Sequence, residues 1–545
     1  MEEGARAPRF LIPAVWICVV ACAFGGLSLA LGMDANWDLR NYHYYLPYAF
    51  LGQREDILAA QTPTFFNPLL DIPFFLAAES WPARWVGGAL GALHGVPFAL
   101  LLFLARRTLA LENPVHRTHL AALIALAGVT GAGALSEVGT VFYDTLLPVG
   151  FLSSLLLIVS RGTFMVEGGA GGLLLACVAG VPAGIAAALK LPHAVAAIGV
   201  CGAMLAVPGS PPPMRRMLAA QAALAVGVGA GMGVAGGWWH WHLWQVYDNP
   251  VFPAFNDVFR SPWAGFESYR GNDFLPAGWG ERLAFALVYP FAPERTSEVP
   301  FRDVRIATLF VLVPLAVAAR LVGRLKGREE KQGRLVHAVP ARCILAAATG
   351  FYLAWGAVFA IYRYAIGLEM LAPLALVAAI GWLTPSWLTP GRRVFWAVVM
   401  LGVMGATTRP ADWGRVPWSA RYGEVRGLPT LPEDSMVLMV GRGALSFLIP
   451  AFPRGGRFVR IESWFTKPED DNGLTRLMHG TVAAHGGPLF MLFVKDHDRA
   501  RAHQMATAYG LRLEARACSI LTASLSVESY SLCALSRGDT RLSIF

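Results

Sequence analysis

Apolar residues come in runs of about 20 along most of the first 410 positions, and short polar segments separate these runs. A helix of about 20 apolar residues is long enough to cross a bilayer. The first run exceeds the usual signal-peptide core of about 7–15 residues and more runs follow it, so we expect it to be retained. The pattern predicts about eleven spans, at 10–32, 84–105, 118–136, 140–160, 169–189, 191–207, 217–240, 303–323, 342–361, 365–386 and 394–408.

Two polar segments between these runs are long enough to form exterior loops, 33–83 and 238–302. Within the first, the stretch 63–80 is apolar but interrupted by prolines and Asp71, which predicts an interfacial or re-entrant element. The second opens with four tryptophans and continues into prolines flanked by Asn and Asp, which indicate an ordered loop. An amphipathic stretch at 278–291 could lie flat on the bilayer surface.

The last part of the chain, 411–545, has a different pattern. Short apolar runs at 435–440, 458–461 and 488–494 predict buried strands, and 496–509 predicts a helix that Gly510 ends. Strands alternating with helices indicate a small α/β domain. Because this domain lacks a convergent acid, base or nucleophile motif, we expect it to bind an acceptor or a partner. Cys518 and Cys533 could pair in an oxidising exterior, although sequence gives no distance between them.

Composition agrees with a membrane protein, because 55% of the 545 residues are hydrophobic and only 15% are charged. With the spans above, every basic cluster falls on one side of the membrane, which predicts that this side is cytoplasmic. The N-terminus would then be inside and the C-terminal domain outside. The net charge of +9 follows from this topology and does not argue for nucleic acid. The clusters are Arg6 and Arg9; Arg106, Arg107 and Arg117; Arg215 and Arg216; 320–334; and Arg392 and Arg393.

A dense set of acids and aromatic residues follows the first apolar run. It contains Asp34, Asp38, Tyr42, His43 and Tyr45. Tyrosine and tryptophan at this depth are typical of an interfacial belt, but such a belt needs no acids. Acids at a membrane rim are costly and usually functional. We therefore interpret the cluster as a site, and a helix here would place Asp38, Tyr42 and Tyr45 on one face.

Three further polar positions fall on the same side under this topology. Lys190 lies between two spans and is either a snorkelling lysine or a group that binds an anion. Asp248 and Asn249 either cap a turn or contribute to the site. Arg363, followed by Tyr364, breaks the positive-inside pattern and is expected to have an anionic partner.

These groups suit transfer to a hydroxyl from a donor that carries a phosphate. A carboxylate such as Asp38 could act as general base on the acceptor hydroxyl. Lysine and arginine, or a divalent cation such as Mg²⁺ or Mn²⁺ held by acids, could stabilise a phosphate leaving group.

The run Asp38-Leu39-Arg40-Asn41-Tyr42 resembles the membrane-embedded glycosyltransferases of the GT-C class, in particular the aminoarabinose transferases and the protein O-mannosyltransferases. The aromatic segment 65–76, the pair Arg363-Tyr364 and the loop 249–253 are similar to further motifs of that class. The resemblance covers roughly 1–410. Two departures are that Leu39 stands where the class often has a second acid, and that the usual Lys before the prolines is missing.

The resemblance implies a GT-C fold in a bacterial inner membrane and a polyprenyl-phosphate sugar as donor. The sugar would pass to a hydroxyl of a glycan, lipid or protein on the exterior face, with Asp38 as general base and Asp34 as a second acid. The donor-binding and phosphate-binding residues would be Lys190, Arg363, Tyr364, Tyr42 and His43. Asp248 and Asn249 would contact the acceptor or a metal.

Two other classes fit the spans. A transporter or flippase for a lipid-linked glycan would also have many spans, but inverted repeats and broken helices at matching positions are not found in this sequence. An assembly protein with an exterior binding domain would leave the Asp38 cluster unexplained. The sequence therefore predicts a mainly α-helical, polytopic glycosyltransferase with a catalytic membrane domain, 1–410, and an exterior α/β domain, 411–545.

Overall fold

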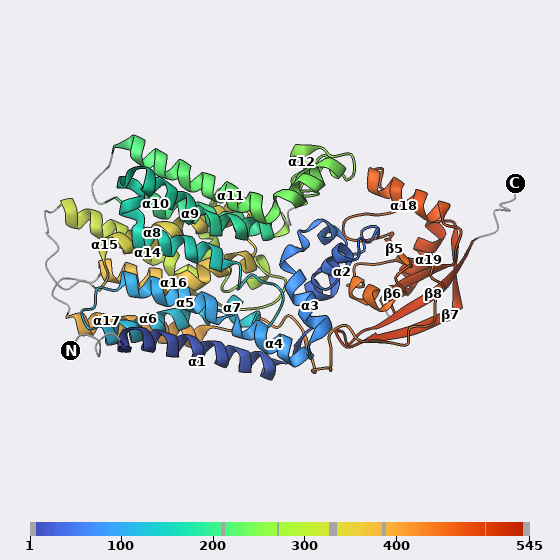
Figure 1. Ribbon diagram of the computed structural model, residues 1–545, viewed down its shortest axis with the longest axis horizontal. Helices are drawn as coiled ribbons and strands as arrows, with labels where there is room; N and C mark the ends of the chain where they lie inside the picture. The colour runs from blue at the N-terminus through green and yellow to red at the C-terminus, as the bar shows by residue number, and fades with distance from the viewer. Residues whose placement is uncertain are drawn as a thin grey trace.

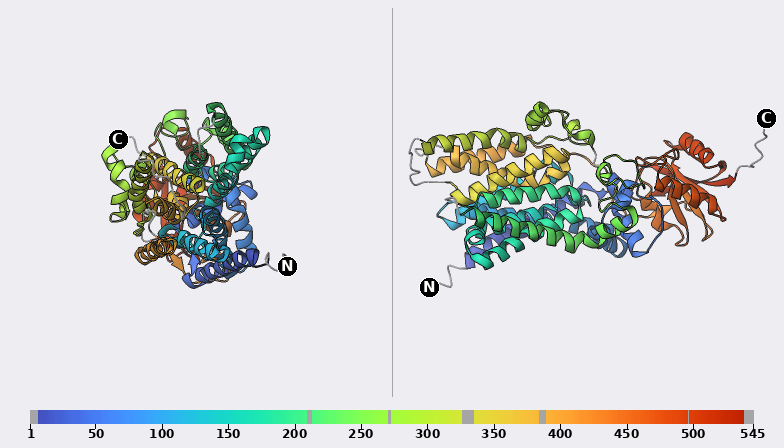
Figure 2. Two further views of the ribbon diagram at one scale, coloured as in Figure 1. Left: turned by 90° about the vertical axis from the view of Figure 1, so that its left-hand side faces the viewer. Right: turned by 90° about the horizontal axis from the view of Figure 1, so that it is seen from above.

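The computed structural model describes residues 7–208, 213–269, 272–325, 335–383, 389–495 and 497–537. The molecule is elongated, with a bundle of long helices at one end and a smaller domain built on a β-sheet at the other (Figures 1 and 2). Its N-terminus lies at the bundle end and its C-terminus at the sheet end. The predicted fold class, a helical membrane protein with a C-terminal α/β domain, is confirmed.

Within the described ranges, eight helical segments are long and apolar enough to cross a membrane. They include α1 (Ala7–Leu31), α4 with α5 (Ala83–Ala92 and Gly95–Thr108), α8 (Pro148–Glu167), α9 (Gly169–Leu189), α11 (Met214–Tyr247), α14 (Arg305–Leu325), α15 (Ala338–Val358) and α16 (Ile366–Leu383). Length and composition alone do not settle which helices cross a membrane, so the predicted number of about eleven spans stays a prediction. The other three are helices as well, namely α6 (Pro114–Val129), α10 (Ala194–Leu205) and α17 (Pro390–Thr407).

The fourth predicted span begins later than expected. Residues 140–147 form turns and irregular backbone, and α8 starts at Pro148, a residue that suits the first position of a helix. The predicted span 140–160 includes Asp144, but in the structure Asp144 precedes the helix. It is fully buried there.

Small residues allow the central helices to approach closely. Gly180 and Gly184 of α9 face Gly227 and Gly231 of α11, and a Cβ atom at any of these positions would overlap backbone of the opposite helix. Reciprocal small-residue faces of this kind drive helix association in a membrane, where burial of apolar surface contributes little.

The basic ends of several helices lie together at the end of the bundle that is remote from the sheet domain. These are the last turn of α5 and the first turns of α11 and α17, which carry the arginine pairs at 106–107, 215–216 and 392–393 (Figure 1). Arg6 and the basic residues of 326–334 lie outside the described residues. The arrangement agrees with a single basic face, and the orientation in a membrane stays a prediction.

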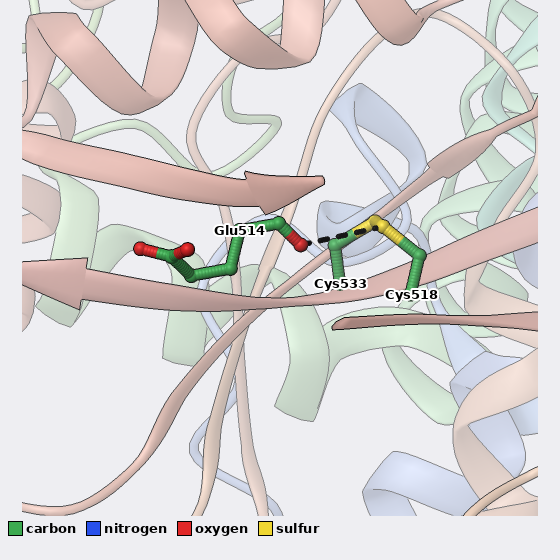
Figure 3. Close-up of a disulfide and its surroundings, with 3 residues drawn as sticks. All are labelled: Glu514, Cys518 and Cys533. Carbon is green, nitrogen blue, oxygen red and sulfur yellow. Dashed lines mark hydrogen bonds between the residues drawn. A yellow bond between two sulfur atoms is a disulfide. The ribbon is translucent and has the colours of Figure 1, made fainter. Parts of the chain in front are cut away.

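The C-terminal domain contains a six-stranded sheet in the order β3-β7-β8-β6-β4-β5. The predicted strands are found as β4 (Met436–Met439), β5 (Arg457–Arg460) and β6 (Leu489–Val494), which run parallel, and the predicted helix is α19 (Arg499–Ala508). Sequence patterning missed the helix α18 (Gly473–Ala484) and the antiparallel strands β3 (Val425–Arg426), β7 (Leu511–Ala523) and β8 (Ser529–Arg537). Cys518 and Cys533 face each other across β7 and β8 and form a disulfide (Figure 3).

The segment 33–83 lies between the bundle and the sheet domain and is bonded to the latter. Its first strand, β1 (Met33–Asp34), pairs with β2 (Arg415–Val416), and Ile57 forms a parallel bridge to Val459 at the edge of the sheet. Between these points come the π-helix η2 (Leu39–His43) and α2 (Tyr45–Leu51). The predicted interfacial stretch 63–80 consists of η3 (Thr62–Phe65), η4 (Pro68–Leu70) and α3 (Ile72–Ser80).

The second exterior loop starts later than predicted, because α11 continues to Tyr247 and includes the four tryptophans. It then contains α12 (Asn256–Phe259), η6 (Asn272–Phe274), α13 (Trp279–Val288) and η7 (Pro293–Arg295). The helix α13 corresponds to the predicted amphipathic stretch.

Candidate active site

A cavity of about 170 Å³ lies where several predicted spans end. Its walls come from η2, from the residues around η3 and η4, and from the segment that joins α9 to α10. The C-terminal part of α11, the loop 251–254 and the 3₁₀-helix η8 (Tyr362–Ala365) before α16 complete them. The charged and titratable side chains that line it are Asp38, Tyr42, His43, Asp71, Lys190, His240, Tyr269, Arg363 and Tyr364.

Asp38 lines the polar part of this cavity. Arg363 donates from Nη1 to Asp38 Oδ2 over 2.9 Å, and the Tyr42 hydroxyl donates to the same oxygen over 3.0 Å. Burial raises the pKa of Asp38. Arg363 and, to a lesser extent, His43 and Lys190 lower this pKa by more than burial raises it, so it lies below its usual value. The carboxylate is therefore held in its charged form.

The backbone of η2 explains why only one tyrosine reaches Asp38. Residues 39–43 form a π-turn, which has more residues per turn than an α-helix. Tyr42 still returns to Asp38, but Tyr45 is rotated away and its hydroxyl donates to Asp56 over 2.8 Å. The prediction that Asp38, Tyr42 and Tyr45 share one face was therefore wrong for Tyr45.

Arg363 is held in place by aromatic rings as well as by acids. Its guanidinium lies 4.7 Å from the ring centroid of Phe142 and 5.0 Å from that of Trp413, and Nη2 is 3.4 Å from Glu298 Oε1. Such contacts orient a planar cation. The expected anionic partner of Arg363 is thus present as Asp38.

Lys190 follows α9 directly and points inward, so it does not snorkel toward solvent. Its Nζ donates to Asp144 Oδ2 over 2.7 Å and to the Phe142 carbonyl over 3.0 Å, and it lies 5.7 Å from the Tyr364 ring centroid. Asp144 also contacts His193 Nε2 over 2.9 Å. Burial raises the pKa of Asp144, but Lys190 and His193 outweigh this and the pKa is lowered.

His43 pairs with Asp71, at the start of α3, in the same cavity. Nδ1 of His43 is 2.7 Å from Asp71 Oδ1, and both side chains are buried. Burial raises the pKa of Asp71, and the imidazole opposes that rise. Sequence reasoning noted Asp71 only as an interruption of an apolar stretch. Its position between Pro68 and Pro73, which initiate the short helices, was the available signal.

The remaining walls are apolar and aromatic. Phe65, Phe66, Leu189, Trp239, Leu243 and Phe252 are among the residues that form them. Asn67 connects this part of the site to the bundle, because its Nδ2 donates to the Ala235 carbonyl of α11 over 3.0 Å and to the Ala188 carbonyl of α9 over 3.4 Å. The apolar wall is thus continuous with the spans.

The structure does not bring Asp34, Asp248 or Asn249 to the cavity lining. Asp34 is buried and accepts hydrogen bonds from Asn36 and from the backbone of Val141, which fixes the loop before α8. Asn249 stabilises its own loop, because its Nδ2 donates to the carbonyl of Ala254. Asp248 is exposed and ends α11 in a left-handed conformation. Their predicted catalytic and acceptor roles thus find no support in their positions, although loop residues 251–254 do line the cavity.

The described residues contain no group of three or more His, Cys, Asp or Glu side chains that could hold a metal ion. Each carboxylate at the polar end faces a cation or an imidazole instead, in the pairs Asp38–Arg363, Asp144–Lys190 and Asp71–His43. The donor set around this cavity therefore does not fit the Mg²⁺ or Mn²⁺ ion that the sequence suggested.

No family model and no curated protein matches the chain. Among solved structures, one that is similar is ArnT from Cupriavidus metallidurans bound to undecaprenyl phosphate. The comparison covers 95% of this chain and 97% of that chain, with 13% sequence identity and a TM-score of 0.37.

Proposed function

We propose that this protein is an integral-membrane glycosyltransferase that moves a sugar from a polyprenyl-phosphate donor to an acceptor hydroxyl on the extracytoplasmic face. The observation that carries the proposal is the two-part character of the cavity. One part is apolar and continuous with the spans, and the other holds Lys190, Arg363 and Asp38. A lipid with a phosphate headgroup has this same division between tail and head.

Arg363 is the group best suited to bind the donor phosphate. In the described structure its Nη1 and Nη2 have acidic partners, whereas its buried Nε has no hydrogen-bond partner. An unpaired guanidinium donor in a water-poor site favours a bound anion. Lys190 adds a second positive charge to the cavity, although Asp144 neutralises part of it.

Asp38 is the proposed general base. A base must be ionised before it can take a proton, and the cations around Asp38 keep it ionised at neutral pH. In the proposed reaction, the acceptor oxygen attacks the anomeric carbon as Asp38 removes its proton. The carbon–oxygen bond to the phosphate breaks, and polyprenyl phosphate leaves with the electron pair.

The first test uses the purified protein in nanodiscs, with undecaprenyl-phosphate sugars as donors. Asp38→Asn keeps the size of the side chain but removes its basicity, so transfer should fall by about 10²–10⁴-fold while binding of undecaprenyl phosphate persists. The matched control is Asp257→Asn, which changes an exposed acid of α12 outside the cavity and should leave transfer unchanged. Near wild-type transfer by a folded Asp38→Asn protein would show that Asp38 is not the general base.

A flippase would bind the same lipid but would move it across the bilayer without forming a glycosidic bond. Product analysis by mass spectrometry separates the two activities. Binding of undecaprenyl phosphate with no transfer from any donor of this class, together with lipid movement in liposomes, would favour the flippase.

A further inference from the structure

The imidazole of His43 has one nitrogen engaged and one free. Nδ1 lies 2.7 Å from Asp71 Oδ1 in a pair whose side chains are only 4% and 5% exposed. Nε2 is buried and has no hydrogen-bond partner in the described part of the chain, although His43 lines the cavity. A buried polar atom without a partner costs free energy, so a group that meets this atom during turnover would explain its retention.

Asp38 is a poor final place for a proton. The hydrogen bonds from Arg363 and Tyr42 both stabilise its charged form. Protonation of Asp38 would leave the Arg363 cation beside a neutral acid in a site shielded from water. A proton that Asp38 takes from an acceptor hydroxyl must therefore move on before the next turnover.

The His43–Asp71 pair has the opposite preference. A proton on Nε2 would convert the imidazole into a cation that already faces the carboxylate of Asp71. Burial strengthens that attraction, because the effective dielectric constant is low away from water. Asp71 also fixes the tautomer, since a carboxylate that accepts from Nδ1–H leaves Nε2 as the acceptor.

We propose that the His43–Asp71 pair receives the proton that Asp38 removes from the acceptor hydroxyl, and this inference rests on the glycosyl transfer proposed above. The acceptor O–H bond breaks, its oxygen bonds to the anomeric carbon, and the proton passes through Asp38 to Nε2 of His43. The bond between the anomeric carbon and the phosphate oxygen breaks at the same time, and its electron pair leaves with polyprenyl phosphate. Solvent takes the proton from Nε2 after product release. Asp71 is a positioning residue in this scheme.

Tyr143 supports the precise placement of the His43 ring. Its ring meets the His43 ring edge to face with centroids 5.5 Å apart, and its backbone has a φ of 60°. A bulky residue in this left-handed region is strained, and such strain is concentrated at functional sites. The titratable and charged groups around His43 are Asp38 and Tyr42 from its own segment, Asp71, Tyr143, and Lys190 from the end of α9.

The decisive variant is His43→Asn, because its amide can still donate to Asp71 but has no equivalent of Nε2. We measure kcat from pH 5 to 9 with the undecaprenyl-phosphate sugar that wild-type protein uses fastest. In wild type, kcat should fall on the acid side as Nε2 becomes protonated and can no longer accept. In His43→Asn, kcat at neutral pH should be about 10- to 100-fold lower, and this acid limb should be absent.

Two further measurements separate proton transfer from a structural role. Imidazole added to His43→Ala should restore at least about tenfold in kcat, with a dependence on the unprotonated imidazole concentration. Asp71→Asn should move the acid limb of kcat to lower pH, because the imidazolium loses the carboxylate that stabilises it. Binding of undecaprenyl phosphate should change by less than about twofold in all three variants.

The outcomes divide cleanly between this inference and the function on which it rests. Wild-type protein that binds undecaprenyl phosphate but transfers no sugar contradicts both. An active wild type whose acid limb persists in His43→Asn contradicts the inference alone. Weaker lipid binding by His43→Asn, without imidazole rescue of His43→Ala, would return His43 to the phosphate-binding role that the sequence suggested.

Discussion

Arg363 combines three features that a lysine could not reproduce together. It is paired with Asp38, it lies over the rings of Phe142 and Trp413, and it keeps a buried Nε donor free. A guanidinium is planar and carries five donors, whereas an ammonium is a compact point charge. The orientation of the cation should therefore matter as much as its charge.

Arg363→Ala should weaken binding of undecaprenyl phosphate by about 10- to 100-fold, the effect of losing a hydrogen bond to a charged group. Arg363→Lys should recover only part of that loss, because the stacking and the free Nε are absent. Binding is measured by microscale thermophoresis in nanodiscs. Arg260→Ala, which removes an exposed arginine stacked on Phe266 of the exterior loop, should bind as wild type does. Equal affinity for Arg363→Ala and wild type would rule out the donor role.

Sequence alone found the acid and the arginine of the site but not all of their partners. Asp38 and Arg363 stood out because each is unusual at its depth in the membrane pattern. Asp71 did not, because its partner His43 is 28 positions away and no spacing rule connects them. Asp34 was the second candidate acid, and its hydrogen bond from the backbone of Val141 is equally hidden in the sequence because the two residues are 107 positions apart.

At the scale of elements, the site depends on how closely α9 and α11 approach. The cavity takes Lys190 from the end of α9 and Trp239, His240 and Leu243 from α11. The glycines of both helices have no side chains, so the two backbones come into contact. This contact sets the distance between these walls. Bulk added at this interface should separate the two walls.

Gly184→Leu should destabilise the protein, because its Cβ would overlap the Val228 backbone of α11. The overlap can be relieved only if α9 and α11 move apart. Overpacking of this kind costs about 1–3 kcal/mol. We expect a lower Tm in detergent and weaker lipid binding. Gly233→Leu is the matched control on α11, because a Cβ there meets nothing within 4 Å. If both variants had the same Tm as wild type, close packing of α9 and α11 would not contribute to the stability of the protein.

Element types were more predictable than their ends. Long apolar runs gave the major helices, but the turns before α8 could not be distinguished from a span because residues 140–147 are nearly as apolar as the helix that follows. The π-turn of η2 has no sequence signature that separates it from an α-helix. Strand β7 was missed because Arg512, Glu514 and Arg516 break the apolar pattern expected for a buried strand.

For the whole molecule, the disulfide provides a test of orientation. Disulfides persist in oxidising compartments and are rare in the cytosol, so the Cys518–Cys533 pair favours an exterior location for the sheet domain. In intact spheroplasts, an impermeant maleimide should label Cys518 and Cys533 only after reduction. A variant that lacks the five other cysteines avoids background labelling from Cys18, Cys22, Cys177, Cys201 and Cys343. Labelling that requires membrane permeabilisation would place this domain inside.

The strand pairings at the junction have a consequence for how such proteins can recombine. The sheet domain holds the segment that carries Asp38 through the β1–β2 pairing, through the Ile57–Val459 bridge and through a hydrogen bond from Ser446 to the Asn41 carbonyl. A chimera joined once, near residue 410, would therefore pair a foreign sheet with a native active-site segment. The exchangeable unit is discontinuous in sequence and comprises 33–83 together with the C-terminal domain. Successful exchange of that domain between distant homologues should require both pieces to come from one parent.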